Sequence, residues 1–191
     1  MRRLVQLYAG LVLFGISMAM VVRSTLGNIP WDVLHQGLAR HTGLSFGTVA
    51  VIVAVLVLLL WIPLRERPGI GTISNALVLG PVVDVALRLI PEGLPLPWRV
   101  VLFVVGVVLN GVATAAYIGA RFGPGPRDGL MTGLVARTGG SLRLIRTGIE
   151  VVVVAVGWAL GGTFGVGTVV FALSIGPLIH VLMPRFEIRA G

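Results

Sequence analysis

Two aspartates are the sharpest candidates for chemistry in this chain. Asp32 and Asp128 each stand two residues after a proline, at the beginning of a short polar segment. Such a carboxylate can cap a helix by accepting backbone N–H groups at its N-terminus. It can equally bind a ligand or a proton where a broken helix ends inside a membrane. Both interpretations stay open, because a buried carboxylate needs donors in either case. Arg127, next to Asp128, would partly neutralise the second carboxylate.

Arg146 and Glu150 form a second candidate, four residues apart and therefore on one face of a helix. Glu150 lies inside an apolar run, where a charge is costly unless it is paired. The pair can be self-neutralised, with Arg143 as a further partner, or it can relay a proton or a cation.

Four further polar residues lie within apolar stretches. Asp84 and His180 are isolated ionisable groups, and histidine is the side chain most easily titrated near neutral pH. Because they occupy equivalent positions in the internal repeat described below, we expect them to approach each other at a pseudo-two-fold axis. Asn75 and Asn110 either line a polar cavity or join helices by hydrogen bonds.

The composition decides the class of protein in which these residues act. Hydrophobic residues make up 56% of the 191 residues and charged residues only 12%, against about 25% charged in soluble domains. A soluble enzyme and a disordered chain are therefore excluded, and an integral membrane protein remains. The absence of cysteine excludes disulfides and thiolate chemistry. Since the three histidines are dispersed and no nucleophile–base pair is evident, we expect no metal, no cofactor and no enzymatic activity.

Apolar windows place the elements that must position the candidates. Six windows are long enough, or nearly so, to cross about 30 Å of hydrocarbon, and two short segments of about 18 Å as helix are not. The short segments are predicted to be re-entrant or interfacial helices, and tryptophans near span ends are typical of interfacial anchors. The windows are 4–22, 45–62, 71–90, 99–119, 144–160 and 168–183; the short segments are 30–41 and 126–137; the tryptophans are Trp31, Trp61, Trp98 and Trp158.

The sequence overlays on itself at an offset of 96 residues. Gly80-Pro81 matches Gly176-Pro177, for example, while Ala50 and Ala54 match Arg146 and Glu150. We therefore predict two repeats, 1–95 and 96–191. Each would hold three spans and one short helix, and an odd number of spans inverts the second repeat. The predicted fold is an all-α integral membrane protein with about six transmembrane helices and two short broken or re-entrant helices.

Arginine placement predicts the orientation, and no lysine is present. Short clusters of arginine between apolar runs favour membrane orientation over nucleic-acid binding. With six spans and both termini cytoplasmic, the inside segments hold about ten arginines and the outside segments four, in agreement with the positive-inside rule. The inside residues are Arg2, Arg3, Arg65, Arg67, Arg121, Arg127, Arg137, Arg143, Arg185 and Arg189; the outside ones are Arg23, Arg40, Arg88 and Arg99.

The stretch Gly123-Pro124-Gly125-Pro126-Arg127-Asp128-Gly129-Leu130-Met131, followed by Arg146-x-x-x-Glu150, resembles the YczE/YitT-like group of small bacterial inner-membrane proteins. The resemblance covers most of the chain. It implies a multi-pass helical fold in the bacterial cytoplasmic membrane, and it implies no particular activity. The first half departs from the pattern, because Trp31 stands where the second half has Arg127.

The function we expect is that of a small-molecule or ion permease with its site at the interface between the repeats. Inverted repeats can exchange conformations and expose a central site to each side in turn. The alternative is a non-transporting accessory, assembly or regulatory factor. Expected partners are the lipid bilayer, an unknown small molecule or ion, and a second copy of the chain, since so small a monomer encloses little space.

Overall fold

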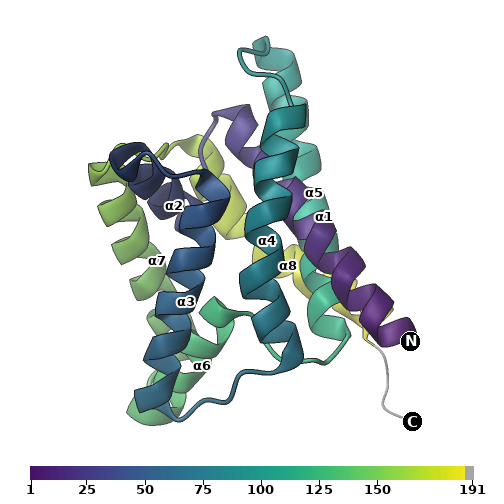
Figure 1. Ribbon diagram of the computed structural model, residues 1–191, viewed down its shortest axis with the longest axis vertical. Helices are drawn as coiled ribbons and strands as arrows, with labels where there is room; N and C mark the ends of the chain where they lie inside the picture. Colours follow the sequence, from purple (N-terminus) through teal and green to yellow (C-terminus); the bar gives the residue numbers. More distant parts are fainter. Residues whose placement is uncertain (188–191) are drawn as a thin grey trace.

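The computed structural model describes residues 1–187, and Arg189 lies outside them. The described part of the chain is all-helical, as predicted (Figure 1). Its helices are α1 (Arg2–Ser24), α2 (Pro30–Thr42), α3 (Phe46–Leu64), α4 (Ile70–Leu89), α5 (Leu96–Gly119), α6 (Pro126–Thr138), α7 (Leu142–Ala159) and α8 (Val166–Phe186).

Five of these helices, α1, α3, α4, α5 and α8, are long and apolar enough to cross a membrane. The sixth predicted span, 144–160, is a helix within α7. With Arg143, Arg146 and Glu150 on its first turns, α7 is not among the five. Five of the six predicted windows thus form helices whose length and composition suit a membrane span, and the predicted number of six is not reached among the described residues.

The two short helices match the predicted segments to within one residue at their ends. Both begin at a proline, which suits the first helical position because its missing N–H loses no partner there. They are followed by Gly43 and Gly139, which adopt left-handed conformations with φ of 74° and 66°. Each has 13 residues, or about 20 Å. In Figure 1, α2 lies near the upper end of the molecule and α6 near the lower end.

The most extensive contact between two helices joins α1 and α5, the first helices of the two halves. Gly10 and Gly106, which are equivalent in the repeat, allow this close approach. A Cβ atom on Gly10 would lie 2.8 Å from the backbone nitrogen of Tyr117, and one on Gly106 would lie 3.0 Å from Val21. α4 packs on α1, and α8 packs on α5.

The short helices each pack against a long helix of the other half, α2 against α7 and α6 against α3. Trp61 of α3 covers Gly129 of α6, where a Cβ atom would lie 2.0 Å from the indole ring. Its indole Nε1 also donates to the Pro126 carbonyl at 3.0 Å. Trp61 and Trp31 are 2% and 7% exposed. The prediction that they anchor at the interface is therefore wrong, because helix packing buries them.

In the first half, α3 packs against α4, most closely at the beginning of α3. Gly47 lies directly against Gly80, so that a Cβ atom on Gly47 would meet the Gly80 carbonyl oxygen at 2.0 Å. Asp84 accepts hydrogen bonds from the Ser45 hydroxyl at 2.6 Å and from the Gly47 amide at 2.7 Å. The Asp84 carboxylate therefore ties α4 to the beginning of α3.

In the second half, α7 and α8 share no comparable interface within the described residues. The positions equivalent to Gly47, Gly80 and Asp84 are Arg143, Gly176 and His180. A Cβ atom on Gly176 would meet nothing within 4 Å, and His180 is exposed. The corresponding helix pairs thus differ: α3 packs closely against α4, whereas α7 and α8 stand apart.

Candidate functional site

The N-termini of α2 and α6 meet at the centre of the molecule. The Arg127 guanidinium carbon lies 5.1 Å from the centroid of the Trp31 ring, a cation–π contact. The two residues occupy equivalent positions in the repeat. The contact therefore marks the junction of the two halves.

Asp32 lies at this junction and is completely buried. Its Oδ1 atom is 3.2 Å from His35 Nδ1 and 3.7 Å from Arg127 Nη2. Neither carboxylate oxygen accepts a hydrogen bond from the residues that the structure describes, and α2 has no side-chain cap. The capping interpretation is therefore wrong for Asp32, which instead balances the charge of an arginine from the other half.

His35 joins Asp32 to Arg127. Its Nε2 atom lies 3.4 Å from Arg127 Nη2, and its side chain is 1% exposed. Burial lowers the pKa of the His35 imidazole, and the Arg127 charge acts in the same direction, while the Asp32 carboxylate opposes both. The neutral tautomer with its proton on Nδ1 fits this arrangement, since Nε2 can then accept from Arg127 and Nδ1–H faces Asp32.

Asp128 has a different environment. The Tyr117 hydroxyl donates to its Oδ2 atom at 2.8 Å, and α6 has no side-chain cap. Capping is thus wrong for Asp128 as well. The reason is that its carboxylate turns toward Tyr117 of α5 and accepts no backbone N–H of α6 among the described residues.

A cavity of about 270 Å³ opens beside the junction. This is close to the smaller ligand pockets of proteins, which start at about 300 Å³. The cavity is lined mainly by α5, α6, α7 and α8, with further residues from α1, α2 and α4. The lining combines apolar and aromatic side chains with polar ones, four of which are charged. The predicted site residues that line it are Asn75, Asn110, Arg127, Asp128, Arg146 and Glu150; Trp31, Tyr117, Phe171, Ile175 and Ile179 are among the others.

Arg146 and Glu150 form an ion pair at the wall of this cavity. Arg146 Nε donates to Glu150 Oε1 at 2.9 Å, and the two side chains are 43% and 21% exposed. This matches the self-neutralised pair expected from their spacing. Arg143 is exposed and takes part in no ion pair among the described residues.

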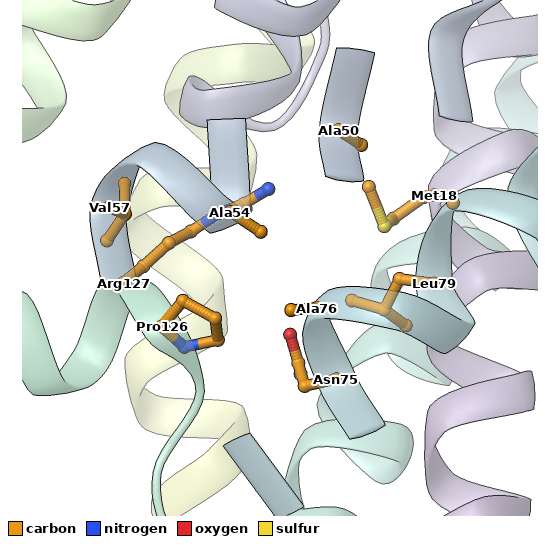
Figure 2. Close-up of a pocket in the computed structure, with 10 residues that line it drawn as sticks. Met18, Ala50, Ala54, Val57, Asn75, Ala76, Leu79, Pro126 and Arg127 are labelled. Carbon is orange, nitrogen blue, oxygen red and sulfur yellow. The ribbon is translucent and has the colours of Figure 1, made fainter. Parts of the chain in front are cut away.

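A second, much smaller cavity of about 20 Å³ lies between α3, α4 and the beginning of α6. Figure 2 shows the Arg127 side chain reaching past Pro126 into the space beside Ala54, with Asn75 pointing into the same space. The two cavities are counterparts under the repeat. Ala50 and Ala54 line the small one where Arg146 and Glu150 line the large one, and Arg127 borders both.

The remaining predicted residues lie elsewhere or have structural contacts. Asn110 lines the large cavity but also donates to the Ser17 hydroxyl at 2.8 Å, which joins α5 to α1. Asp84, on α4, is hydrogen-bonded to the beginning of α3, and His180 is exposed on α8. No ion pair joins the two among the described residues. The expected approach of these two at the pseudo-two-fold axis is therefore wrong, because Asp84 is engaged by α3.

The sequence alone singles out neither His35 nor Tyr117 as a member of the site. The one available signal for His35 is its spacing of three residues from Asp32, which places both on one helix face. Nothing comparable links Tyr117 to Asp128, because their contact joins two different helices.

The apolar helices and the buried charges at their centre define a multi-pass membrane protein. The chain belongs to a family of unknown function (DUF6198), whose profile matches residues 1–184. The resemblance to the YczE group is thereby confirmed.

The chain is similar over most of its length to curated bacterial proteins. It is 36% identical over 173 residues to an uncharacterized protein of Haemophilus influenzae, covering 91% of this chain and 79% of the relative. It is 31% identical over 181 residues to the uncharacterized membrane protein YczE of Bacillus subtilis, covering 93% and 84%. The uncharacterized protein YyaS of the same organism is 26% identical over 182 residues, covering 93% and 90%. No solved structure matches the chain.

Proposed function

We propose that this protein is a small-molecule or ion permease of the bacterial cytoplasmic membrane, with its site at the junction of two inverted repeats. The observation that carries the proposal is the pair of unequal cavities, about 20 and 270 Å³, which are counterparts under the repeat and meet at Arg127. The cavity on one side of Arg127 is nearly closed, and the cavity on its other side is open. A permease that works by alternating access needs such an arrangement.

The placement of the short helices supports the inverted relation of the repeats. α2 and α6 lie near opposite ends of the molecule (Figure 1), as two copies related by an axis in the membrane plane would. Three spans in each half, with α7 as the second span of the second half, produce this inversion. Both termini would then lie on the same side, and arginine placement favours the cytoplasm.

The helix packing suggests how the two sides exchange. α3 is closed on α4 through Gly47 and Gly80, whereas α7 stands apart from α8. Gly176, the counterpart of Gly80, has open space around it. If α7 approached α8 there while α3 separated from α4, the large cavity would shrink and the small one would grow. The second half would then have the closed helix packing that the first half has now, and the first half would have the open packing.

Cysteine cross-linking tests this exchange, and the absence of native cysteine makes the experiment clean. Val51 lies against Gly80, where its Cγ2 atom is 2.5 Å from the position of an added Cβ. The counterparts of these two residues are Thr147 and Gly176. We therefore expect that oxidation of the Thr147→Cys, Gly176→Cys variant forms a disulfide between α7 and α8. This disulfide would hold the protein in the alternate conformation, in which α7 packs on α8.

A third cysteine reports which cavity is accessible to a membrane-impermeant maleimide in right-side-out and inside-out vesicles. Thr114→Cys reports on the large cavity and Ala54→Cys on the small one. Cross-linking should reduce labelling of Thr114→Cys, increase labelling of Ala54→Cys from the opposite side, and be reversed by a reductant. Gly176→Cys without Thr147→Cys is the matched control. If cross-linking changes the labelling of neither Thr114→Cys nor Ala54→Cys, alternating access is contradicted. The alternative function, a non-transporting accessory factor, would then be favoured.

A further inference from the structure

We propose that the large cavity binds a small zwitterion with an apolar body, such as an amino acid with a large apolar side chain. Arg127 would bind its carboxylate and Asp128 its ammonium group. This inference rests on the proposed function, because it names the class of molecule that the permease would carry.

Arg127 has donors that the protein does not use. A guanidinium carries five N–H groups, yet within the described residues its sole hydrogen-bonding contact is the 3.4 Å approach to His35 Nε2. Asp32 lies 3.7 Å away, which is too far for a hydrogen bond. The Arg127 side chain is 25% exposed and borders the cavity. A ligand carboxylate can therefore pair with two of its N–H groups at once, the geometry that arginine favours.

Asp128 lacks a cation of its own. Its hydrogen bond comes from the neutral Tyr117 hydroxyl, and no described basic group lies within ion-pair distance of it. Glu150, the other acid of the cavity, is already paired with Arg146 at 2.9 Å. The Asp128 carboxylate, which has no ion-pair partner among the described residues, is thus adjacent in the chain to Arg127, whose guanidinium has N–H groups that donate no hydrogen bond.

The unused Arg127 donors and the Asp128 carboxylate, which has no ion pair among the described residues, together favour a ligand that carries both signs. Asp32, Arg127, Asp128 and the Arg146–Glu150 pair together carry one excess negative charge. A simple anion would raise this excess. A simple cation would leave the Arg127 donors unused. A zwitterion satisfies both groups and leaves the net charge unchanged.

The rest of the lining suits an apolar body. Phe171, Ile175 and Ile179 of α8 face the same space as Met131 of α6. Trp31 stacks on Arg127 and so holds the guanidinium at the cavity wall. Such a pocket, mostly apolar with few placed charges, is typical of sites for small molecules.

Three ligands of nearly equal shape separate the charge classes. L-Phenylalanine carries both charges, phenethylamine lacks the carboxylate, and 3-phenylpropionate lacks the ammonium group. Binding to the purified protein in lipid nanodiscs is measured by thermal shift and by equilibrium dialysis, with empty nanodiscs correcting for partition into lipid. We expect phenylalanine to bind about tenfold or more tightly than either analogue, since each charge-assisted pair contributes about that factor.

Substitutions assign each charge to its partner. Arg127→Gln should reduce phenylalanine affinity to the level of phenethylamine and leave phenethylamine binding unchanged. Asp128→Asn should do the same relative to 3-phenylpropionate. Arg127→Lys, which keeps the charge that balances Asp32, should give intermediate affinity if Arg127→Gln does not fold. Arg88→Gln, at an exposed position on α4, is the control and should bind all three ligands as the parent does.

The proposal is overturned if either analogue binds as tightly as phenylalanine, or if neither phenylalanine nor L-leucine binds at millimolar concentration. It is also overturned if Arg127→Gln weakens all three ligands equally. These measurements involve no transport, and the cysteine labelling above involves no ligand. If labelling switches but phenylalanine does not bind, the zwitterion inference fails and the permease stands. If phenylalanine binds but labelling does not switch, the permease fails.

Discussion

The two halves of this protein have the same order of helices, one long, one short and two long, but differ in how the last two helices pack. In the first half, Gly47, Gly80 and Asp84 hold α3 against α4, and about 20 Å³ of space remains beside them. In the second half, the counterpart helices α7 and α8 stand apart around about 270 Å³. Helix pairs that correspond in the sequence repeat are therefore packed differently in the two halves. The residues that differ between the halves, such as Gly47 and Arg143, lie where this packing differs.

The topology of the two halves can be tested by an all-or-none measurement. Thr42 and Thr138 end α2 and α6, and both are exposed. Changed singly to cysteine and treated in intact cells with a membrane-impermeant maleimide, Thr42→Cys should be labelled. Thr138→Cys should react only after the membrane is opened. Labelling of both from the same side would show parallel halves and would remove the basis for exchange between them.

The two aspartates should differ most strongly in their contribution to stability. Asp32→Asn leaves the mostly buried Arg127 without its counter-charge, and we expect a loss of about 3 kcal/mol in the free energy of unfolding. Asp128→Asn keeps an acceptor for the Tyr117 hydroxyl and should cost less than about 1 kcal/mol. Thermal unfolding of both variants in the same detergent compares them. Equal losses would mean that the junction does not depend on the Asp32–Arg127 pair.

The glycines of the closed and open helix pairs give a smaller, matched contrast. A Cβ atom at Gly80 would lie 2.5 Å from the Gly47 carbonyl oxygen, whereas one at Gly176 meets nothing within 4 Å. Gly80→Ala should therefore destabilise the protein by about 1–3 kcal/mol. Gly176→Ala should be neutral or stabilising by up to about 1 kcal/mol, because alanine favours the helix. Thermal unfolding again provides the measurement. A stable Gly80→Ala would show that α3 does not depend on this close approach.

Much of the fold followed from local sequence. Apolar windows of about 20 residues predicted the long helices, and proline at the start with glycine after the end placed α2 and α6 to within a residue. The offset of 96 residues identified the counterparts on which every comparison between the halves depends. The spacing of Arg146 and Glu150 predicted their pair, because four residues return to the same helix face.

The tertiary structure decided the rest, since helix crossings bring together residues whose separation in the chain carries no signal. Asp32 meets Arg127, and Tyr117 meets Asp128, only because α2, α5 and α6 converge. Helix capping predicts backbone partners for both aspartates. In the structure, however, Asp32 pairs with Arg127 of α6, and Asp128 accepts a hydrogen bond from Tyr117 of α5. Asp84 and His180 are equivalent in sequence, yet packing gave one a role in closing α3 on α4 and left the other exposed. Repetition determines which positions correspond, whereas packing determines which of them touch.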